Sequence, residues 1–401
     1  TRGLNPHVKM KATNIPWLKE IPEHWEMSKI SSHFRQRNEK VSDKDYPALS
    51  VSKQGVTPQL DNVALSNAEG TSRKLVKVGD YAVNSRSDRK GSCGVSKYEG
   101  SVSLITIVLE PFNINGEYVH YLFRSNPWVE EFYRNGRGIV ADLWTTNYQM
   151  MKSMYMPVPP LSEQRSIVSY LDAKCGKIDE WVTKKQKEVE HLQELKQRVI
   201  ADAVTRGLNP HVKMKATNIP WLKEIPEHWE NKRLAAMFTD DIETNKDFQY
   251  KRAFKFNYGC LVPKNEIGDP EEYRDVYVKY SIVYTGDILV NGLNLNYDFI
   301  SQRVACAPSD GIITSAYVVC RPRQNVNYDY YTYLFKAMDS MKLFHGMGTG
   351  IRLTLSFKEL KKQMLPVPPL EEQKQIVAHI TDKSSKIDKL IANITKEIEC
   401  I

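Results

Sequence analysis

Apolar residues recur with a seven-residue period along two stretches of the chain, each of which follows the motif Pro-Val-Pro-Pro-Leu. The first series contains Val168, Leu171, Cys175, Ile178, Val182, Lys185, Val189, Leu192, Lys196 and Val199. The second series contains Val377, Ile380, Ser384, Ile387, Ile391, Ile394, Ile398 and Ile401. A sustained heptad pattern predicts a coiled coil. We therefore expect two long helices, at residues 161–204 and 370–401, that pack on each other in an antiparallel pair.

The alternative for each stretch is an amphipathic helix that lies on its own domain. The first stretch covers about 40 residues, or roughly 60 Å of helix, which exceeds what a domain of this size can cover. The prolines set an extended entry to each helix, and Glu163 and Glu372 are the acidic residues that a first helical turn prefers. The second stretch is shorter, so we expect a short distal helix.

The segments before the two helices have the pattern of strands, turns and shorter helices. Apolar strands broken by a Gly-Asp turn are predicted at residues 74–84 and 280–291, and β-branched runs that end at proline follow at 101–111 and 312–322. Apolar residues at helical spacing predict one helix at residues 116–134 and one at 329–344. Each segment is therefore predicted to be a mixed α/β (α+β) domain.

The chain is a tandem repeat. Residues 1–26 return without a change at 205–230, and three further matches follow in the same order, with offsets between 204 and 211. A pseudo-twofold pair of homologous domains is the natural packing for such a chain. The predicted division is a first domain at 1–160, a long helix at 161–204, a second domain at 205–369 and the distal helix at 370–401.

The two copies are nearly identical at their ends and differ in their middles, at residues 27–155 and 231–364. This distribution favours one constant scaffold that presents two different surfaces. The alternative is a recent duplication that has drifted, but drift alone would scatter changes over the first 26 residues as well.

Composition narrows the class of protein. The chain has 41% apolar and 26% charged residues and no apolar run long enough to span a bilayer. Its beginning shows no signal peptide pattern, and its six cysteines are widely spaced without a Cys-x-x-Cys motif, so we expect a cytoplasmic protein without membrane contact, disulfide framework or zinc knuckle. The net charge of +8 permits a polyanionic partner.

The sequence contains no convincing catalytic motif. The segment "GMGTGI" at residues 346–351 lacks the third glycine of a dinucleotide loop, and it follows a predicted helix rather than a strand. The segment "SNPWVE" at 125–130 is better interpreted as a helix start than as the motif of an amino-methyltransferase. His24 and His228 occur in the duplicated Pro-Glu-His-Trp-Glu motif and are interpreted as structural. We expect no catalytic and no metal site.

Nucleic-acid chemistry is concentrated in variable loops. After a predicted strand, the first copy places Arg86, Arg89, Lys90 and Lys97 among glycines and serines. At the same place the second copy has Asn291, Asn294, Asn296 and Tyr297. Arginine can bind guanine or phosphate through two hydrogen bonds, and asparagine can bind adenine in the same way. Further candidates lie in three other loops: Arg137, Thr145, Arg352, Thr354, Lys53 and Gln54. The alternative for all of them is a solvated surface loop.

The combination of two variable domains, each closed by "PVPPLxEQ" and a long helix, resembles the specificity subunit of type I restriction–modification systems. The repeated "NPHVKMK…IPWLKEIPEHWE" is similar to the segment that opens a recognition domain in this family. The resemblance implies a non-catalytic subunit in which each domain reads one half of a split, asymmetric site in double-stranded DNA. It also implies that the helices set the unread spacer and dock two methyltransferase subunits, which restriction subunits join. S-adenosylmethionine, ATP and Mg²⁺ would be used by these partners.

Three alternatives remain from the sequence. One is the recognition subunit of a related combined nuclease–methylase. The others are a protein-interaction scaffold, which would not bind DNA in a salt-dependent way, and a methyltransferase, which would need a cofactor loop.

Overall fold

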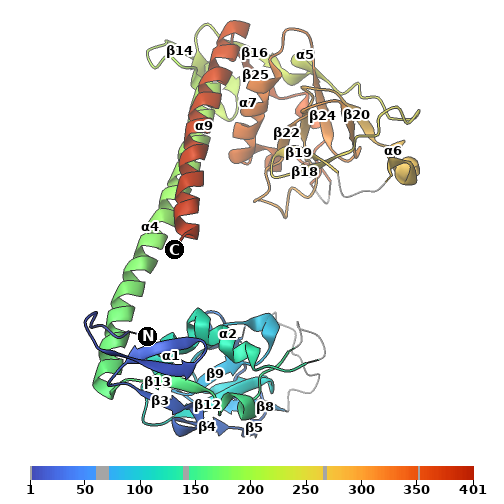
Figure 1. The fold of residues 1–401 in the computed structure, drawn as a ribbon. Helices are drawn as coiled ribbons and strands as arrows, with labels where there is room; N and C mark the ends of the chain where they lie inside the picture. The colour runs from blue at the N-terminus through green and yellow to red at the C-terminus, as the bar shows by residue number, and fades with distance from the viewer. Residues whose placement is uncertain (1, 60–71, 139–143, 265–268, 351–352) are drawn as a thin grey trace. The chain divides into compact units, whose positions relative to one another are not determined.

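The computed structural model describes the chain except for residues 1, 60–71, 139–143, 265–268 and 351–352 (Figure 1). It divides into two compact units, unit 1 at Thr1–Glu180 and unit 2 at Trp181–Ile401. This confirms the predicted mixed α/β class, and the main elements of unit 1 recur in the same order in unit 2. No helix in the described part of the chain combines the length and apolar character needed to cross a membrane.

Unit 1 is organised around an antiparallel sheet with the strand order β10-β9-β12-β4. These strands are β4 (Phe34–Arg37), β9 (Tyr81–Asn84), β10 (Cys93–Val95) and β12 (Thr106–Pro111). A second sheet has the order β11-β8-β5, formed by β5 (Lys40–Val41), β8 (Arg73–Val76) and β11 (Gly100–Val102). Three hairpins or pairs complete the strands: β1 (Met10–Ile15) with β2 (Leu18–Pro22), β6 (Leu49–Ser52) with β7 (Gly55–Pro58), and β3 (Glu26–Lys29) with β13 (Tyr155–Val158).

The helices of unit 1 cover one face of the first sheet and supply its aromatic core. They are α1 (Gly116–Arg124), α2 (Asn126–Arg134) and the short α3 (Tyr148–Met151). The ring of Phe123 stacks on that of Trp128 with 3.9 Å between centroids, and Trp128 stacks on Phe132 at 5.2 Å. These residues lie in one buried cluster with Tyr81 and Leu109 of the sheet.

The prediction of a single helix at residues 116–134 is wrong. Ser125 is extended and separates α1 from α2. Pro127 lies in the first turn of α2, where its missing N–H is harmless, but a continuous helix would need that donor. In unit 2 the predicted helix at 329–344 ends early for a different reason. There, α7 (Tyr328–Ser340) stops before Lys342, whose left-handed φ of 59° separates it from a short 3-10 turn at Leu343–Gly346.

Unit 2 repeats the plan of unit 1. Its main sheet has the order β17-β24-β21-β22, from β17 (Phe238–Thr239), β21 (Ile288–Val290), β22 (Val304–Cys306) and β24 (Val318–Pro322). The smaller pairs are β14 (Met214–Ile219) with β15 (Leu222–Pro226), β16 (Glu230–Arg233) with β25 (Met364–Val367), β18 (Phe254–Asn257) with β19 (Cys260–Pro263), and β20 (Ser281–Val283) with β23 (Gly311–Ile313). The remaining short helices are α5 (Leu234–Met237), α6 (Arg274–Tyr277) and α8 (Phe357–Leu360).

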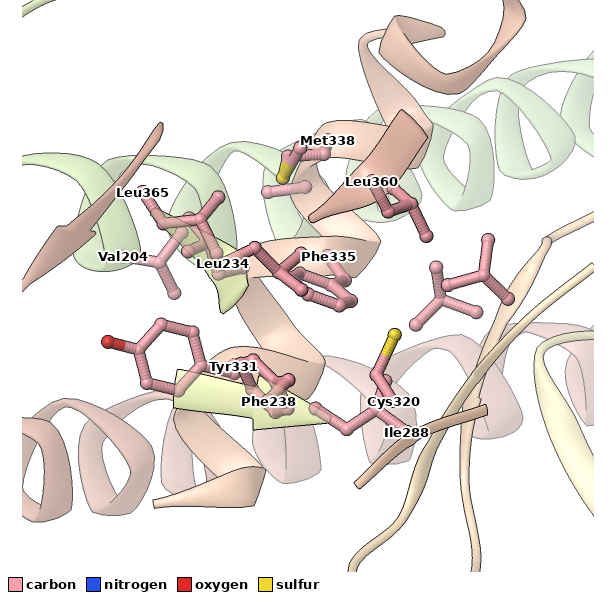
Figure 2. Close-up of a cluster of buried hydrophobic side chains, with 14 of the residues drawn as sticks. Val204, Leu234, Phe238, Ile288, Cys320, Tyr331, Phe335, Met338, Leu360 and Leu365 are labelled. Carbon is pink, nitrogen blue, oxygen red and sulfur yellow. The ribbon is translucent and has the colours of Figure 1, made fainter. Parts of the chain in front are cut away.

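The core of unit 2 joins the sheet to both long helices. Phe238, Tyr331 and Phe335 lie among Ile288 and Cys320 of the sheet, and Val204 reaches the same cluster from α4 (Leu161–Arg206), as Figure 2 shows. Ile376 and Ile380 enter it from α9 (Leu370–Glu399) and are fully buried. The last turns of α4 and the first turns of α9 are therefore fixed by the domain core itself.

In unit 2 the two helices form the predicted antiparallel pair (Figure 1). Lys196 Nζ lies 2.7 Å from Asp388 Oδ1, and Lys185 Nζ lies 3.7 Å from Glu397 Oε2, so residue numbers rise along one helix as they fall along the other. The half-buried or buried seam positions are Val182, Lys185, Val189, Leu192, Lys196 and Val199 on α4 and Val377, Ile380, Ser384, Ile387, Ile391, Ile394 and Ile398 on α9.

Other predicted seam positions do not pack in this way. Cys175 is exposed and Ile178 is 43% exposed, while Val168 and Leu171 are half-buried on the part of α4 that belongs to unit 1. Ile401 lies beyond the end of α9 and is 64% exposed. The heptad pattern is longer than the paired region, which in unit 2 extends to the contact between Lys185 and Glu397.

One set of contacts is repeated at the start of each long helix, and we call it the helix clasp. In unit 1 the carboxylate of Glu163 accepts a hydrogen bond from Trp25 Nε1 at 3.1 Å and contacts His24 Nε2 at 2.7 Å. In unit 2 Glu372 accepts from Trp229 Nε1 at 3.0 Å and contacts His228 Nε2 at 2.7 Å. Both histidines therefore take part in the contact that joins the opening segment of each unit to its long helix.

The neighbours of the clasp are repeated as well. Gln164 Nε2 donates to Pro159 O and its Oε1 accepts from Asn115 N, and Gln373 makes the same two contacts with Pro368 and Asn327. The glycine of "TRG" has a positive φ, and in unit 2 a Cβ on Gly207 would lie 3.0 Å from Glu372 Oε1. The clasp therefore gives a physical reason for the unchanged ends of the repeat.

Replacing Glu372 with alanine should lower the free energy of unfolding by about 1–3 kcal/mol, because the fully buried Trp229 loses the acceptor of its indole N–H. The matched control is Glu371→Ala, whose exposed carboxylate pairs with Lys374 one turn away and should contribute less than about 0.5 kcal/mol. Urea unfolding of the full chain measures both. Equal losses in the two variants would show that the clasp does not stabilise the unit.

Candidate nucleic-acid interface

In unit 1, two of the predicted variable loops are joined at one end of the main sheet. Arg86 and Arg137 both form β-bridges with Thr145. Arg137 N donates to Thr145 O at 3.2 Å, Thr145 N donates to Arg137 O at 3.0 Å, and Ser87 N donates to Trp144 O at 2.9 Å. The loop after β9 and the segment before α3 therefore form one surface.

The third loop lies against the same strands. β7 packs on β10, and the two strands approach so closely that a Cβ on Gly94 would lie 3.0 Å from the Cα of Gly55. Lys53 and Gln54 are exposed at the turn of the β6–β7 hairpin, where Gln54 accepts a hydrogen bond from Ser52. This places a cationic and an amide side chain on the hairpin beside the β9–β10 loop.

Ion pairs position the cations of the β9–β10 loop. Arg86 Nε lies 3.1 Å from Asp88 Oδ1, Arg89 Nε lies 3.8 Å from Asp88 Oδ2, and Lys90 Nζ lies 3.0 Å from Glu130. All of these pairs are on the surface, where such contacts are weak. The cations can therefore exchange their carboxylate partners for the phosphates or base edges of DNA at a small cost.

Lys97 is separate from this group. The backbone oxygen of Ser96, the residue before Lys97, accepts a hydrogen bond from Gly79 N at 2.9 Å, at the turn before β9. Since β9 and β10 pair with Cys93 opposite Val83 and Val95 opposite Tyr81, Lys97 lies at the end of the sheet away from Arg86.

A cavity of about 640 Å³ opens beside the loops of unit 1. Its lining comes from the β1–β2 turn, the β9–β10 loop, α2 and the segment before α3, and includes Trp17, Lys90, Glu130, Arg134 and Trp144. The wall of the cavity carries positively and negatively charged side chains and two tryptophan rings.

In unit 2, the corresponding loop at residues 291–303 is organised by a buried arginine. Arg303 is 0% exposed, and its guanidinium donates to the backbone oxygens of Asn291 at 3.0 Å and Leu293 at 2.8 Å and to that of Asp298. Its backbone N–H donates to the carboxylate of Asp339, the pKa of which is raised by burial. The loop is therefore held from inside by charge-assisted hydrogen bonds.

The predicted asparagines have different environments in this loop. Asn291 Oδ1 accepts from Leu293 N at 3.1 Å, so this side chain shapes the loop. Asn294 is exposed and left-handed, with a φ of 53°, a conformation that asparagine tolerates. Asn296 Oδ1 is buried and has no hydrogen-bond partner within the described part of the chain. Tyr297 is 78% exposed.

The other loops of unit 2 pack on this one. Leu355 N donates to Gly292 O at 2.9 Å, and Thr354, which is exposed, forms a β-bridge with Thr349. Arg352 lies outside the described residues. The β18–β19 hairpin corresponds to β6–β7, because Ala253 and Ala48 make the same parallel bridge, to Ile312 and Ser101, and β19 packs on β22 as β7 does on β10.

A family of known proteins matches this arrangement. Residues 226–400 match the family described as "Type I restriction modification DNA specificity domain". The specificity subunit of the type I restriction enzyme MjaVIII of Methanocaldococcus jannaschii is 25% identical to this chain. The match spans 95% of this chain and 90% of the relative. The putative MjaX specificity subunit of the same organism is 23% identical, over 95% of this chain and 91% of its own.

The family match covers most of unit 2, and the relatives, which are similar along nearly the whole chain, support the same family of type I restriction–modification specificity subunits for the chain. A solved chain of a type I restriction–modification system has the same fold, with a TM-score of 0.63, 15% identity and coverage of 94% of both chains. The named relatives are specificity subunits, so the comparisons support the class of protein predicted from the sequence. The methyltransferase alternative is thereby set aside.

The sequence did not single out several residues that shape the loops of unit 2. They are Arg303 inside the loop and the exposed Tyr258, Phe299 and Ile300. One signal for Tyr258 was available, because "FNYGC" at 256–260 occupies the second copy at the position of "SVSKQGV" in the first. No sequence pattern distinguishes the buried Arg303 from an exposed arginine.

Arg86→Ala should weaken binding to the DNA site of this specificity subunit by about 1–3 kcal/mol if Arg86 reads a base. Lys97→Ala, which removes a cation at the other end of the sheet, is the matched control and should change affinity much less. The measurement is equilibrium binding to the site and to unrelated DNA at one fixed salt concentration. Equal losses for Arg86→Ala on both DNAs would mark a phosphate contact, and a larger loss for Lys97→Ala would contradict the placement of the interface.

Proposed function

We propose that each unit reads one half of an asymmetric, two-part DNA site. The observation that carries this proposal is one loop frame filled with different chemistry in the two units. The β9–β10 loop and its neighbours offer Arg86, Arg89 and Lys53, whereas the loops at the corresponding positions of unit 2 offer Asn294 and Tyr258. Different side chains on the same frame are what two readers of different bases require.

We propose further that the long helices set the number of base pairs between the two half-sites. α4 continues from Leu161 to Arg206 without interruption, so it connects the units as one element. The ion pairs of Lys196 and Lys185 with α9 fix the register of the pair in unit 2. A continuous helix that is paired with α9 from Lys185 onward is stiff enough to hold a spacing.

The partners follow from this role. Double-stranded DNA is the ligand, two methyltransferase subunits dock on the helices, and restriction subunits join them in the cytoplasm. S-adenosylmethionine, ATP and Mg²⁺ belong to those partners. Among the described residues, no group of three or more His, Cys, Asp or Glu side chains is arranged to hold a metal ion.

Exchanging the variable middles tests whether each unit reads its own half-site independently of the other unit. Replacing residues 27–155 with residues 231–364 leaves both helix clasps in place and should give a protein that methylates, with its partner, a site made of the second half-site twice. The measurement is the methylated motif in a genome that carries both subunits. If the half-site read by unit 2 also changed, the units would not read independently.

A second variant tests the helices as a ruler. Four residues inserted after Lys187 lengthen α4 by roughly 6 Å, and duplex DNA rises about 3.4 Å per base pair. The unread spacer should therefore grow by one or two base pairs while both half-sites keep their bases. Since Lys185 pairs with Glu397, a four-residue insertion after Thr395 lies opposite and should restore part of the seam packing that the first insertion disturbs.

The control for the ruler is the variant with the α9 insertion alone, which should lose stability without a longer connection between the units. An unchanged spacer in an active, folded α4 variant would show that the spacing is set elsewhere.

A further inference from the structure

Unit 2 presents large apolar side chains to solvent beside its predicted DNA-reading loop. Ile300 is 94% exposed, Tyr258 is 86% exposed and Phe299 is 53% exposed. Ile300 and Phe299 belong to the loop at residues 291–303, and Tyr258 belongs to the β18–β19 turn. The two segments touch, because a Cβ on Gly259 would lie 2.4 Å from Gln302 Oε1.

The loop holds Ile300 in this outward position. The carboxylate of Asp298 accepts hydrogen bonds from Ile300 N at 3.1 Å and Ser301 N at 2.9 Å, and the bonds from Ser301 and Ile300 lower the pKa of Asp298 to about 2. The buried guanidinium of Arg303 donates hydrogen bonds to backbone oxygens of the loop from the interior of the unit. Phe299 stacks on His345 with 4.6 Å between ring centroids. The backbone of the loop is therefore anchored by hydrogen bonds on both sides of Ile300.

Tyr258 is exposed at a strained position. It has a left-handed φ of 45° in the two-residue turn between Asn257 and Cys260, where asparagine, aspartate or glycine is usual. Gly259, which follows it, also has a left-handed φ, of 72°. A bulky residue held in an unfavourable conformation with its ring in solvent is typical of a contact to a ligand.

The corresponding hairpin turn and β9–β10 loop of unit 1 carry polar side chains instead. Its hairpin turn has Lys53 and Gln54 where unit 2 has Tyr258, and its loop has Arg86 and Arg89. The apolar side chains are therefore part of what differs between the two readers, and they lie next to Asn294, which we expect to read adenine. The apolar feature of an A·T pair in the major groove is the 5-methyl group of thymine.

We propose that Ile300 and Tyr258 determine specificity by apolar contact with thymine 5-methyl groups in the half-site that unit 2 reads. The inference rests on the proposed function, because it assigns one chemical group of DNA to one surface of unit 2. Ile300 supplies the contact at the loop apex, and Tyr258 extends the same surface from the neighbouring hairpin.

The test uses the full chain in complex with its methyltransferase partner and duplexes that carry the mapped motif. Each thymine of the unit 2 half-site is replaced in turn by deoxyuridine, which lacks the methyl group. Wild-type complex should lose about fourfold in affinity at each contacted thymine, the effect of one buried methyl group. Ile300→Ser or Tyr258→Ser should lose affinity for thymine DNA and become insensitive to deoxyuridine at the position that it contacts, so that the two changes are not additive.

The controls separate this contact from other roles. Val276→Ser removes an exposed apolar side chain from α6 of the same unit and should retain full sensitivity to deoxyuridine. Deoxyuridine in the half-site of unit 1 should weaken wild type and Ile300→Ser equally. Both serine replacements are at exposed positions, and an unchanged urea unfolding profile confirms that the fold is intact.

Several results would overturn the proposal. They are a unit 2 half-site without thymine, wild-type binding that ignores deoxyuridine, and variants that keep the wild-type sensitivity to deoxyuridine.

Increased fluorescence of 2-aminopurine that depends on Ile300, together with indifference to deoxyuridine, would instead identify a wedge between base pairs. Loss of complex formation in Ile300→Ser would identify a protein contact. If no motif is bound or methylated at all, the proposed function itself fails, which is a different result from a bound motif without methyl dependence.

Discussion

The architecture depends on one carboxylate at the start of each long helix. Glu163 and Glu372 each bind the indole N–H and the imidazole of the segment that opens their unit. This contact ties residues that are more than a hundred positions apart in the chain, and in unit 2 it lies where the core joins Val204 of α4 to Ile376 of α9. A change at either glutamate would leave a buried tryptophan without its acceptor, which is a physical reason for the ends of the repeat to be the same in both copies.

The clasp also determines where variation is tolerated. It fixes the ends of each variable middle through the β3–β13 and β16–β25 pairs that adjoin it. The loops lie elsewhere on each unit, after β9 and β21, where a change of side chain disturbs no clasp contact. One unit can therefore use paired surface cations while the other uses a loop stiffened by a buried arginine. The constant segments thus join each unit to its long helix, and the variable middles supply most of the buried core of each unit as well as its surface loops.

The sequence was sufficient for the features that repeat or have a period. The two copies, the long helices, the antiparallel seam and the positions of the variable loops followed from matching letters and heptads. The break at Ser125 was missed because the apolar spacing continues through it, and only the proline signalled a new start. Cys175 and Ile178 fit the heptad but are exposed, since a period describes a helix face and not what covers it. The inward direction of Arg303 depends on carbonyls brought together by the folded loop, and no local pattern encodes it.

The central claim is that one clasped frame carries two different readers, and the methylated motif of the unaltered protein tests it most directly. The measurement is the map of methylated bases in a genome that carries this chain and its methyltransferase partner. The account predicts one motif with two specified parts of different sequence, separated by a fixed number of unspecified base pairs. A single uninterrupted motif, or methylation without a sequence preference, would contradict it.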